Sequence, residues 1–175
     1  DSAWAETTEG AVAVYGEGLS NCYYPSSLYD YDMCDDAVSL QAFGRLYNWY
    51  AVDDVRSLCP QGWSVPSDQE WVVMEMVLGV QESEAFSVGQ RGADANLSIQ
   101  MKAPTEWPPW SGSQYWYTNS SGFSALPSGR RWQDGSFSNG GDYSMYWTSS
   151  PNDELSYSSE PGEAAWYRWL STSDL

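Results

Sequence analysis

The sequence predicts one α+β domain over residues 1–175, with helices in the first half and antiparallel strands in the second. Two observations lead to this class. A capped helical pattern occupies residues 67–79, and apolar and polar residues alternate in 143–150 and 164–170. The 15 Gly and nine Pro residues predict long loops between these elements.

The first segment, residues 1–20, is mildly apolar and precedes a Gly-Glu-Gly turn. We expect Trp4 and Tyr15 to anchor it to the rest of the domain. Next, Cys22 and Cys34 bracket a loop rich in Tyr and Asp. In an extracellular chain these two cysteines are expected to form a disulfide that closes the loop, which would stabilise the fold by about 3 kcal/mol.

Cys59 is then the odd cysteine of three. An unpaired cysteine in a secreted protein is either buried and free or bonded to a partner outside the chain. Residues 38–52 come before it and carry apolar groups at Leu46, Trp49 and Tyr50. This spacing favours a helix, although the aromatic residues would also suit a strand.

The clearest local signal is the helix at 67–79. Ser67 and Glu70 have the spacing of a capping box, in which each side chain bonds the backbone N–H of the other. Gly79 can adopt the left-handed backbone conformation that ends a helix. We expect one buried stripe along this helix, formed by Trp71, Met74, Val77 and Leu78.

Later elements are shorter. The sequence predicts a short helix around 83–86, Trp residues of 106–110 that cover the core, and a short strand at 122–127. The Asp-Gly pair at 134–135 predicts a hairpin-type turn. Strands at 143–150 and 164–170 complete an antiparallel second half.

Composition excludes several function classes. With 24 acidic and seven basic residues, the net charge of −17 would repel nucleic acid. The chain has no His, so a Ser-His-Asp or Cys-His nucleophile cannot form, and three Cys cannot make a four-cysteine zinc site. Two carboxylates could still hydrolyse a glycoside. With 24 acidic residues in the chain, however, some pair would always look suitable, so the sequence gives this activity little support. The sequence contains no apolar run that is long enough to predict a transmembrane segment.

Several motifs together resemble the Fibrobacter succinogenes major paralogous domain (FISUMP) family. They are Gly-Arg-Leu-Tyr-Asn-Trp-Tyr-Ala-Val at 44–52, Cys-Pro-x-Gly-Trp-x-Val-Pro-Ser-Asp-x-Glu-Trp at 59–71, Thr-Asn-Ser-Ser-Gly-Phe-Ser-Ala-Leu-Pro-x-Gly-Arg at 118–130, Gly-Ser-Phe at 135–137, Tyr-Trp-Thr-Ser-Ser at 146–150 and Ala-Trp-Tyr-Arg-x-Leu at 165–170. The resemblance implies a C-type-lectin-like fold with two helices packed on small antiparallel sheets. It also implies a secreted or surface-exposed bacterial protein of undefined biochemical role.

The chain departs from that family in three ways. Ser64 replaces the usual His, and the family's first strands and its last strand, which ends in Cys, are missing. We therefore expect a domain that is incomplete at both ends. The missing Cys is the expected partner of Cys59, and a neighbouring chain would supply a strand to the open sheet edge.

The resemblance places ligands on the long-loop face, here residues 131–143 and 150–164. Aromatic rings and carboxylates there suit a sugar. Its apolar faces stack on the rings, and its hydroxyl groups donate hydrogen bonds to acids or coordinate calcium. Solvated loops are the simpler interpretation of the same residues. The candidate ligand-binding residues are Trp132, Asp142, Tyr143, Asn152, Asp153, Tyr157, Glu160 and Glu163, with calcium as a candidate ion.

Two functions remain open. One is an extracellular, non-catalytic module that binds glycan or another surface ligand. The other is a structural subunit of a filament, fibre or surface layer that assembles through open sheet edges or Cys59. Catalysis is not expected, because the related formylglycine-generating enzymes use copper-binding cysteines that this chain lacks in its C-terminal half.

Overall fold

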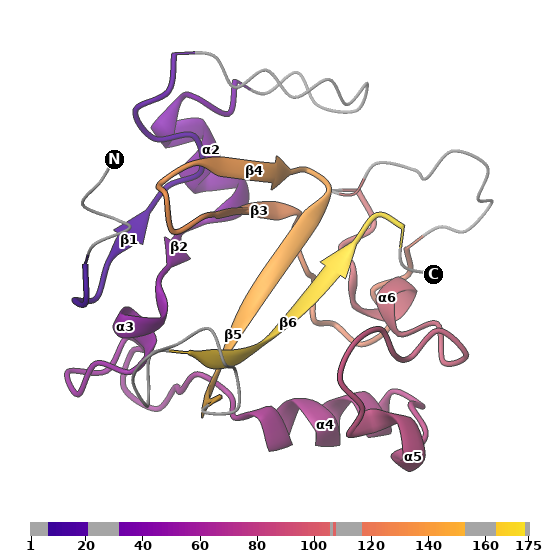
Figure 1. Cartoon of the computed structure of the whole chain (residues 1–175). Coiled ribbons are helices and arrows are strands. Elements are labelled where there is room, and N and C mark those ends of the chain that lie inside the picture. The colour runs from indigo at the N-terminus through magenta and orange to yellow at the C-terminus, as the bar shows by residue number, and fades with distance from the viewer. Residues whose placement is uncertain (1–6, 21–31, 106, 108–116, 153–163, 174–175) are drawn as a thin grey trace.

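The computed structural model describes residues 7–20, 32–105, 107, 117–152 and 164–173 (Figure 1). The predicted α+β class is confirmed, and the described residues form five short helices, whereas the family resemblance implied two. The elements, in order, are β1 (Val12–Ala13), α2 (Asp36–Phe43), β2 (Leu46–Tyr47), α3 (Trp49–Val52), α4 (Asp68–Val77), α5 (Glu82–Ala85), α6 (Leu97–Met101), β3 (Ser128–Arg131), β4 (Phe137–Gly140), β5 (Tyr143–Pro151) and β6 (Ala165–Ser171). None of the described helices is long and apolar enough to cross a membrane.

The strands form two small sheets. β1 pairs with β2, and the larger sheet has the order β4-β3-β5-β6. The expected antiparallel pairing holds for β3 with β4 and for β5 with β6, but β3 runs parallel to β5, with Gly129 opposite Ser144. In Figure 1 the β3–β4 hairpin lies at one end of β5, and the start of α4 lies near the other.

The predicted Asp-Gly turn joins β3 to β4. Arg131 pairs with Phe137 at its base, and Gly135 has a φ of 85°. The Ser136 N–H and hydroxyl both donate to Asp134 Oδ1, at 2.9 and 2.6 Å. These bonds to the Asp134 carboxylate hold its pKa below the usual range.

The α4 helix forms as predicted at its start. Ser67 caps it, and the reciprocal bonds of the capping box join Ser67 and Glu70 at 3.2 and 2.7 Å. The predicted buried stripe is wrong at Val77, which is 80% exposed. A residue six positions after Trp71 lies about 120° away around a helix, so Val77 faces solvent. The buried face is formed by Trp71, Val72 and Glu75.

Residues 38–52, whose spacing favoured a helix with a strand as the alternative, form both kinds of element. Helix α2 ends at Gly44, whose φ of 77° suits a glycine, and β2 follows immediately. Asn48 then starts the short helix α3, because its side chain accepts from the Ala51 N–H at 3.0 Å. Leu46 and Trp49 therefore belong to different elements.

Between α4 and β3, the predicted short helix is confirmed as α5, while α6 was not predicted. The strand expected at 122–127 does not form. Ser124 has a φ of 58°, which breaks the extended backbone, and only one isolated bridge joins Lys102 to Ala125. Trp107 covers the core as expected and donates its indole N–H to the Ala125 carbonyl at 2.7 Å. Trp110 lies outside the described residues.

One apolar core lies between the helices and the sheet. Its buried members are Trp71, Val72, Val80, Ala85, Leu97, Met101, Trp107, Ala125 and Leu170. Tyr15 anchors the first segment as predicted, because the Gly140 N–H donates to its hydroxyl at 3.1 Å. Trp4 lies outside the described residues. So does Cys22, and the Cys22–Cys34 disulfide therefore stays a prediction. Cys59 is a free thiol.

Candidate binding site

The antiparallel ribbon of β5 and β6 gathers aromatic residues on one face. Trp147 pairs with Tyr167, Met145 with Trp169, and Tyr143 with Ser171. Directly paired residues point to the same side of a sheet, and so do residues two positions apart. We name Tyr143, Met145, Trp147, Tyr167 and Trp169 the aromatic face.

The rings of the aromatic face contact one another in two pairs. The Tyr143 and Trp169 rings stack at 5.4 Å with an angle of 29° between their planes, and the Trp147 and Tyr167 rings meet edge to face at 6.1 Å. Tyr167 and Trp169 remain 47% and 46% exposed. Each solvent-facing ring is therefore supported by a neighbour, which limits its rotation.

The opposite side of the same ribbon is fixed in the core. Tyr146 packs against Trp71 and Phe123, with ring centroids 5.7 and 5.3 Å away. Burial raises the pKa of the Tyr146 phenol, so this group stays neutral. Arg168 reaches the helix α4, where its Nε donates to Glu75 Oε1 at 3.0 Å. These contacts hold the aromatic face on a rigid support.

A groove of about 1250 Å³ adjoins the aromatic face. It is lined by β2 and α3, by parts of the 58–66 loop, by β3 and its turn, and by residues 145–147 of β5. Trp147 and Tyr167 belong to both the groove and the aromatic face. Together they offer a continuous aromatic surface to an extended ligand.

Contacts between the two halves of the chain build this groove. The Trp147 indole N–H donates to the Tyr47 carbonyl at 2.9 Å, and the Trp49 and Trp147 rings are 6.0 Å apart. The Ser149 N–H donates to the Pro66 carbonyl at 2.9 Å. The 59–71 signature stretch is therefore joined directly to β5.

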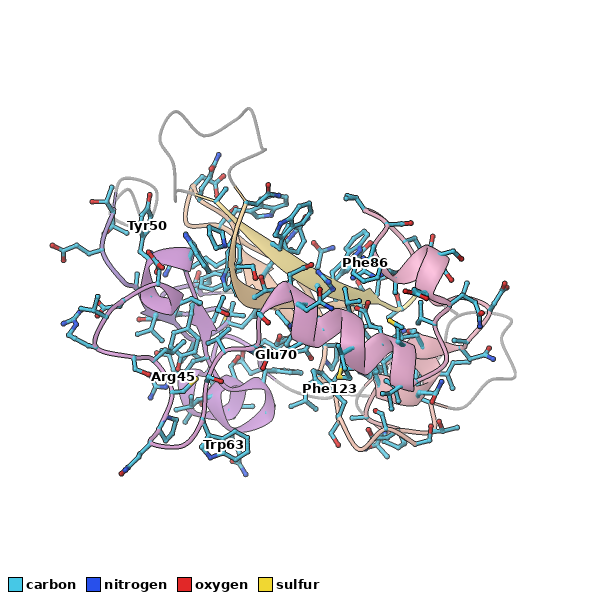
Figure 2. The ribbon with its side chains drawn as sticks, turned by 90° about the horizontal axis from the view of Figure 1, so that it is seen from below. Arg45, Tyr50, Trp63, Glu70, Phe86 and Phe123 are labelled. Carbon is cyan, nitrogen blue, oxygen red and sulfur yellow. The ribbon has the colours of Figure 1, made fainter. Side chains whose placement is uncertain are left out.

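Three arginines line the groove: Arg45, Arg130 and Arg131. The Arg130 guanidinium lies 3.6 Å from the centroid of the Trp132 ring, and its Nε donates to Ser138 Oγ at 3.3 Å. Arg131 lies over Phe137 at 4.9 Å. Arg45 is exposed beside the loop that carries Trp63 (Figure 2). No Asp or Glu occurs among the described residues that line the groove.

The residues proposed from the sequence lie in different places. Asp142 and Tyr143 stand at the start of β5, and Tyr143 is part of the aromatic face. Trp132 lines the groove from the β3–β4 turn. Asn152 is buried after the far end of β5, about 30 Å from Tyr143 along an extended strand, so the structure does not bring these two together. Asp153, Tyr157, Glu160 and Glu163 lie outside the described residues.

The described residues contain no cluster of three or more Cys, Asp or Glu groups that could hold a metal ion. Of the candidate carboxylates, Asp142 lies in that part of the chain, whereas Asp153, Glu160 and Glu163 lie outside it, so calcium stays a prediction. The described lining of the groove combines aromatic rings and arginines with Ser, Thr, Asn and Gln side chains, which can stack on a ligand and exchange hydrogen bonds with it.

Sequence reasoning missed Trp147, Tyr167 and Trp169 as site residues. Their signal was present, since each lies an even number of positions from another aromatic residue or Met in its strand. The same alternation that predicts the strands also places these rings together on the outer face of β5 and β6. The exposed Tyr and Trp rings on that face are the reason for proposing a site.

Comparisons with known proteins give one match. A family model described as Fibrobacter succinogenes major domain covers residues 5–173. No curated protein and no solved structure gives a significant match to the chain.

Proposed function

The chain belongs to the Fibrobacter succinogenes major domain family, and within this family we propose that it is a non-catalytic module that binds a glycan chain. The supporting observation is the aromatic face, above all the half-exposed Tyr167 and Trp169 rings on adjacent same-side positions of β6. Such positions are about 6.6 Å apart, and flat rings at this spacing can stack on the apolar faces of sugar rings.

The proposed site differs from the long-loop face expected from the sequence. Tyr143 and Trp132 are common to both interpretations, while Trp147, Tyr167 and Trp169 are new. The groove would continue the site from the aromatic face toward Tyr50 and Arg45. We also infer an extracellular or cell-surface location, supported by the occurrence of similar domains in secreted bacterial proteins.

A glycan array tests the binding function. The protein would be applied with calcium and again with a chelator, alongside the Tyr167→Ala/Trp169→Ala double variant. We expect binding to at least one glycan class, weakened about tenfold or more for each lost ring. Trp63→Ala is the matched control, since Trp63 is 77% exposed but does not line the groove.

Two results would overturn the proposal. In the first, no glycan binds the folded wild-type protein. In the second, the double variant, with its circular dichroism spectrum and Tm preserved, binds as tightly as the wild type. If the wild type binds with calcium and loses binding only in the chelator, the binding site would instead be a calcium-dependent loop.

A second candidate function is a structural subunit of an extracellular assembly. One observation favours it: among the described residues, β6 pairs with β5 on one side only. A seven-residue edge strand without Pro is able to accept a strand from another chain. Light scattering at increasing protein concentration would detect such assembly. Particle mass should grow with concentration if the chain assembles, and it should stay at the monomer mass if the chain is only a binding module.

A further inference from the structure

The groove is chemically different from the rest of this acidic molecule. The chain has 24 acidic residues, yet none of the described lining residues is Asp or Glu. Three of its seven basic residues, Arg45, Arg130 and Arg131, line the groove. A lining whose described residues carry three guanidinium groups and no carboxylate favours negative charge in a ligand, whereas the surrounding surface disfavours it.

Arg45 and Arg130 differ from the arginines outside the groove in their ion pairs. Arg56 pairs with Asp54, Arg91 pairs with Glu75, and Arg168 pairs with both Glu75 and Asp68. Among the described residues no ion pair involves Arg45 or Arg130. Arg130 is instead held flat against the Trp132 ring, which fixes one edge of its guanidinium and reduces the entropy lost on binding.

A third observation concerns hydrogen-bond donors. The guanidinium groups of Arg45 and Arg130 line the groove, and such groups donate hydrogen bonds but cannot accept them. These two groups therefore match a ligand that is rich in acceptor oxygens.

From these observations we infer that the groove selects acidic oligosaccharides, with Arg45 and Arg130 pairing with carboxylate groups of successive or nearby sugar residues. This inference rests on the proposed glycan-binding function and adds a ligand class to it. Aromatic rings contribute contact with the sugar rings, and the arginines discriminate between a charged and an uncharged sugar of the same shape.

Calorimetric titration with two forms of one glycan tests the charge directly. The first form is a hexamer of galacturonate, and the second is the same hexamer with its carboxyl groups methyl-esterified. Both present the same sugar rings, but only the first carries negative charge. At 0.15 M salt we expect the free acid to bind at least tenfold more tightly than the ester.

The variants Arg45→Gln and Arg130→Gln locate the charged contacts. Each is expected to weaken binding of the free acid about fivefold to tenfold and to leave binding of the ester nearly unchanged. Arg56→Gln is the matched control. It lowers the net charge by the same one unit, but Arg56 does not line the groove, so binding of the acid should not change.

The outcomes separate the two proposals. Equal or tighter binding of the ester overturns the charge inference but leaves glycan binding intact. The same holds if neither hexamer binds while a neutral glycan binds through Tyr167 and Trp169. Failure of every glycan on the array overturns the proposed function itself. If acidic peptides bind with the same dependence on Arg45 and Arg130, the groove recognises charge without a sugar, and both proposals fail.

Discussion

Gly129 has no room for a side chain, because the β3 backbone passes close to Tyr15 and to β4. A Cβ atom there would lie 2.7 Å from the Gly140 nitrogen and would also overlap the Tyr15 ring. Its φ of 68° adds conformational strain for any other residue. Gly129 and Gly140 together let the first segment and the hairpin approach each other, since a Cβ atom on Gly140 would also lie 2.6 Å from the Tyr15 ring.

Gly129→Ala therefore tests this close approach. We expect it to lower the free energy of unfolding by more than about 3 kcal/mol, since strain and overlap act together. Gly18→Ala is the matched control: its φ of 77° is also positive, but no atom lies within 4 Å of the added Cβ. It should cost only about 1 kcal/mol. Equal costs in urea unfolding would show that the overlap with Tyr15 does not exist.

Asp54 and Arg56 form an exposed pair outside the groove. Hydrogen bonds from the Arg56 side chain and backbone lower the pKa of the Asp54 carboxyl to about 2. The folded state thus keeps Asp54 charged at pH values where the unfolded state binds a proton. The stabilisation from this pair is complete above about pH 4 and disappears as the pH falls toward 2.

Carbon-13 NMR of the side-chain carboxyl groups measures this shift. In the wild type the Asp54 signal should titrate near pH 2. In Arg56→Gln its midpoint should move up toward the ordinary value of 3.8, because the main hydrogen bond is lost. A midpoint near the ordinary value in the wild type would contradict the pairing.

At the scale of elements, Glu75 joins parts that are far apart in the sequence. It lies buried on α4, where Arg91 Nε donates to it at 2.7 Å and Arg168 Nε from β6 donates at 3.0 Å. Arg168 also bonds Asp68 at 2.7 Å, at the start of the same helix. One carboxylate thus fixes α4 to the strand that carries the aromatic face.

Glu75→Gln should destabilise the fold by about 3–5 kcal/mol, because the nearly buried Arg91 guanidinium loses this charged partner and Arg168 retains only its bond to Asp68. Urea unfolding measures the loss. Asp54→Asn provides the comparison, since it breaks an exposed pair and should leave the unfolding midpoint almost unchanged. A Glu75→Gln midpoint within the error of the wild type would mean that the bonds of Glu75 to Arg91 and Arg168 contribute nothing.

Elements with strong local signals were predictable from the sequence. The Ser67–Glu70 capping box and the Asp134-Gly135 turn each depend on a few neighbouring residues, and both are confirmed. The parallel contact of β3 with β5 was not predictable, because it depends on Gly129 and on Tyr15 over a hundred residues earlier. Burial of Glu75 in place of Val77 also depended on distant residues, namely Arg91 and Arg168.

The candidate site shows the same limit. Strand alternation predicted β5 and β6, yet the aromatic face depends on their register, in which Trp147 meets Tyr167 and Met145 meets Trp169. The groove depends on contacts between the two halves, such as the bond from Trp147 to Tyr47. No local pattern in the sequence specifies either contact.

At the scale of the whole molecule, the net charge of −17 opposes compaction. Raising sodium chloride from 0.01 to 0.15 M shortens the screening length from about 30 Å to about 8 Å. We expect Tm to rise over this range, because screened carboxylates repel one another less in the folded state. Choline chloride should give the same rise if screening is the cause. A constant or falling Tm in both salts would contradict it.

The central claim is that a glycan lies along the aromatic face of β5 and β6. The most direct test is NMR of the indole N–H signals of the 11 tryptophans during titration with the glycan that binds best on the array. We expect shifts for Trp147 and Trp169 and none for Trp63, which is exposed and does not line the groove. Shifts at Trp63, with Trp147 and Trp169 unchanged, would contradict it.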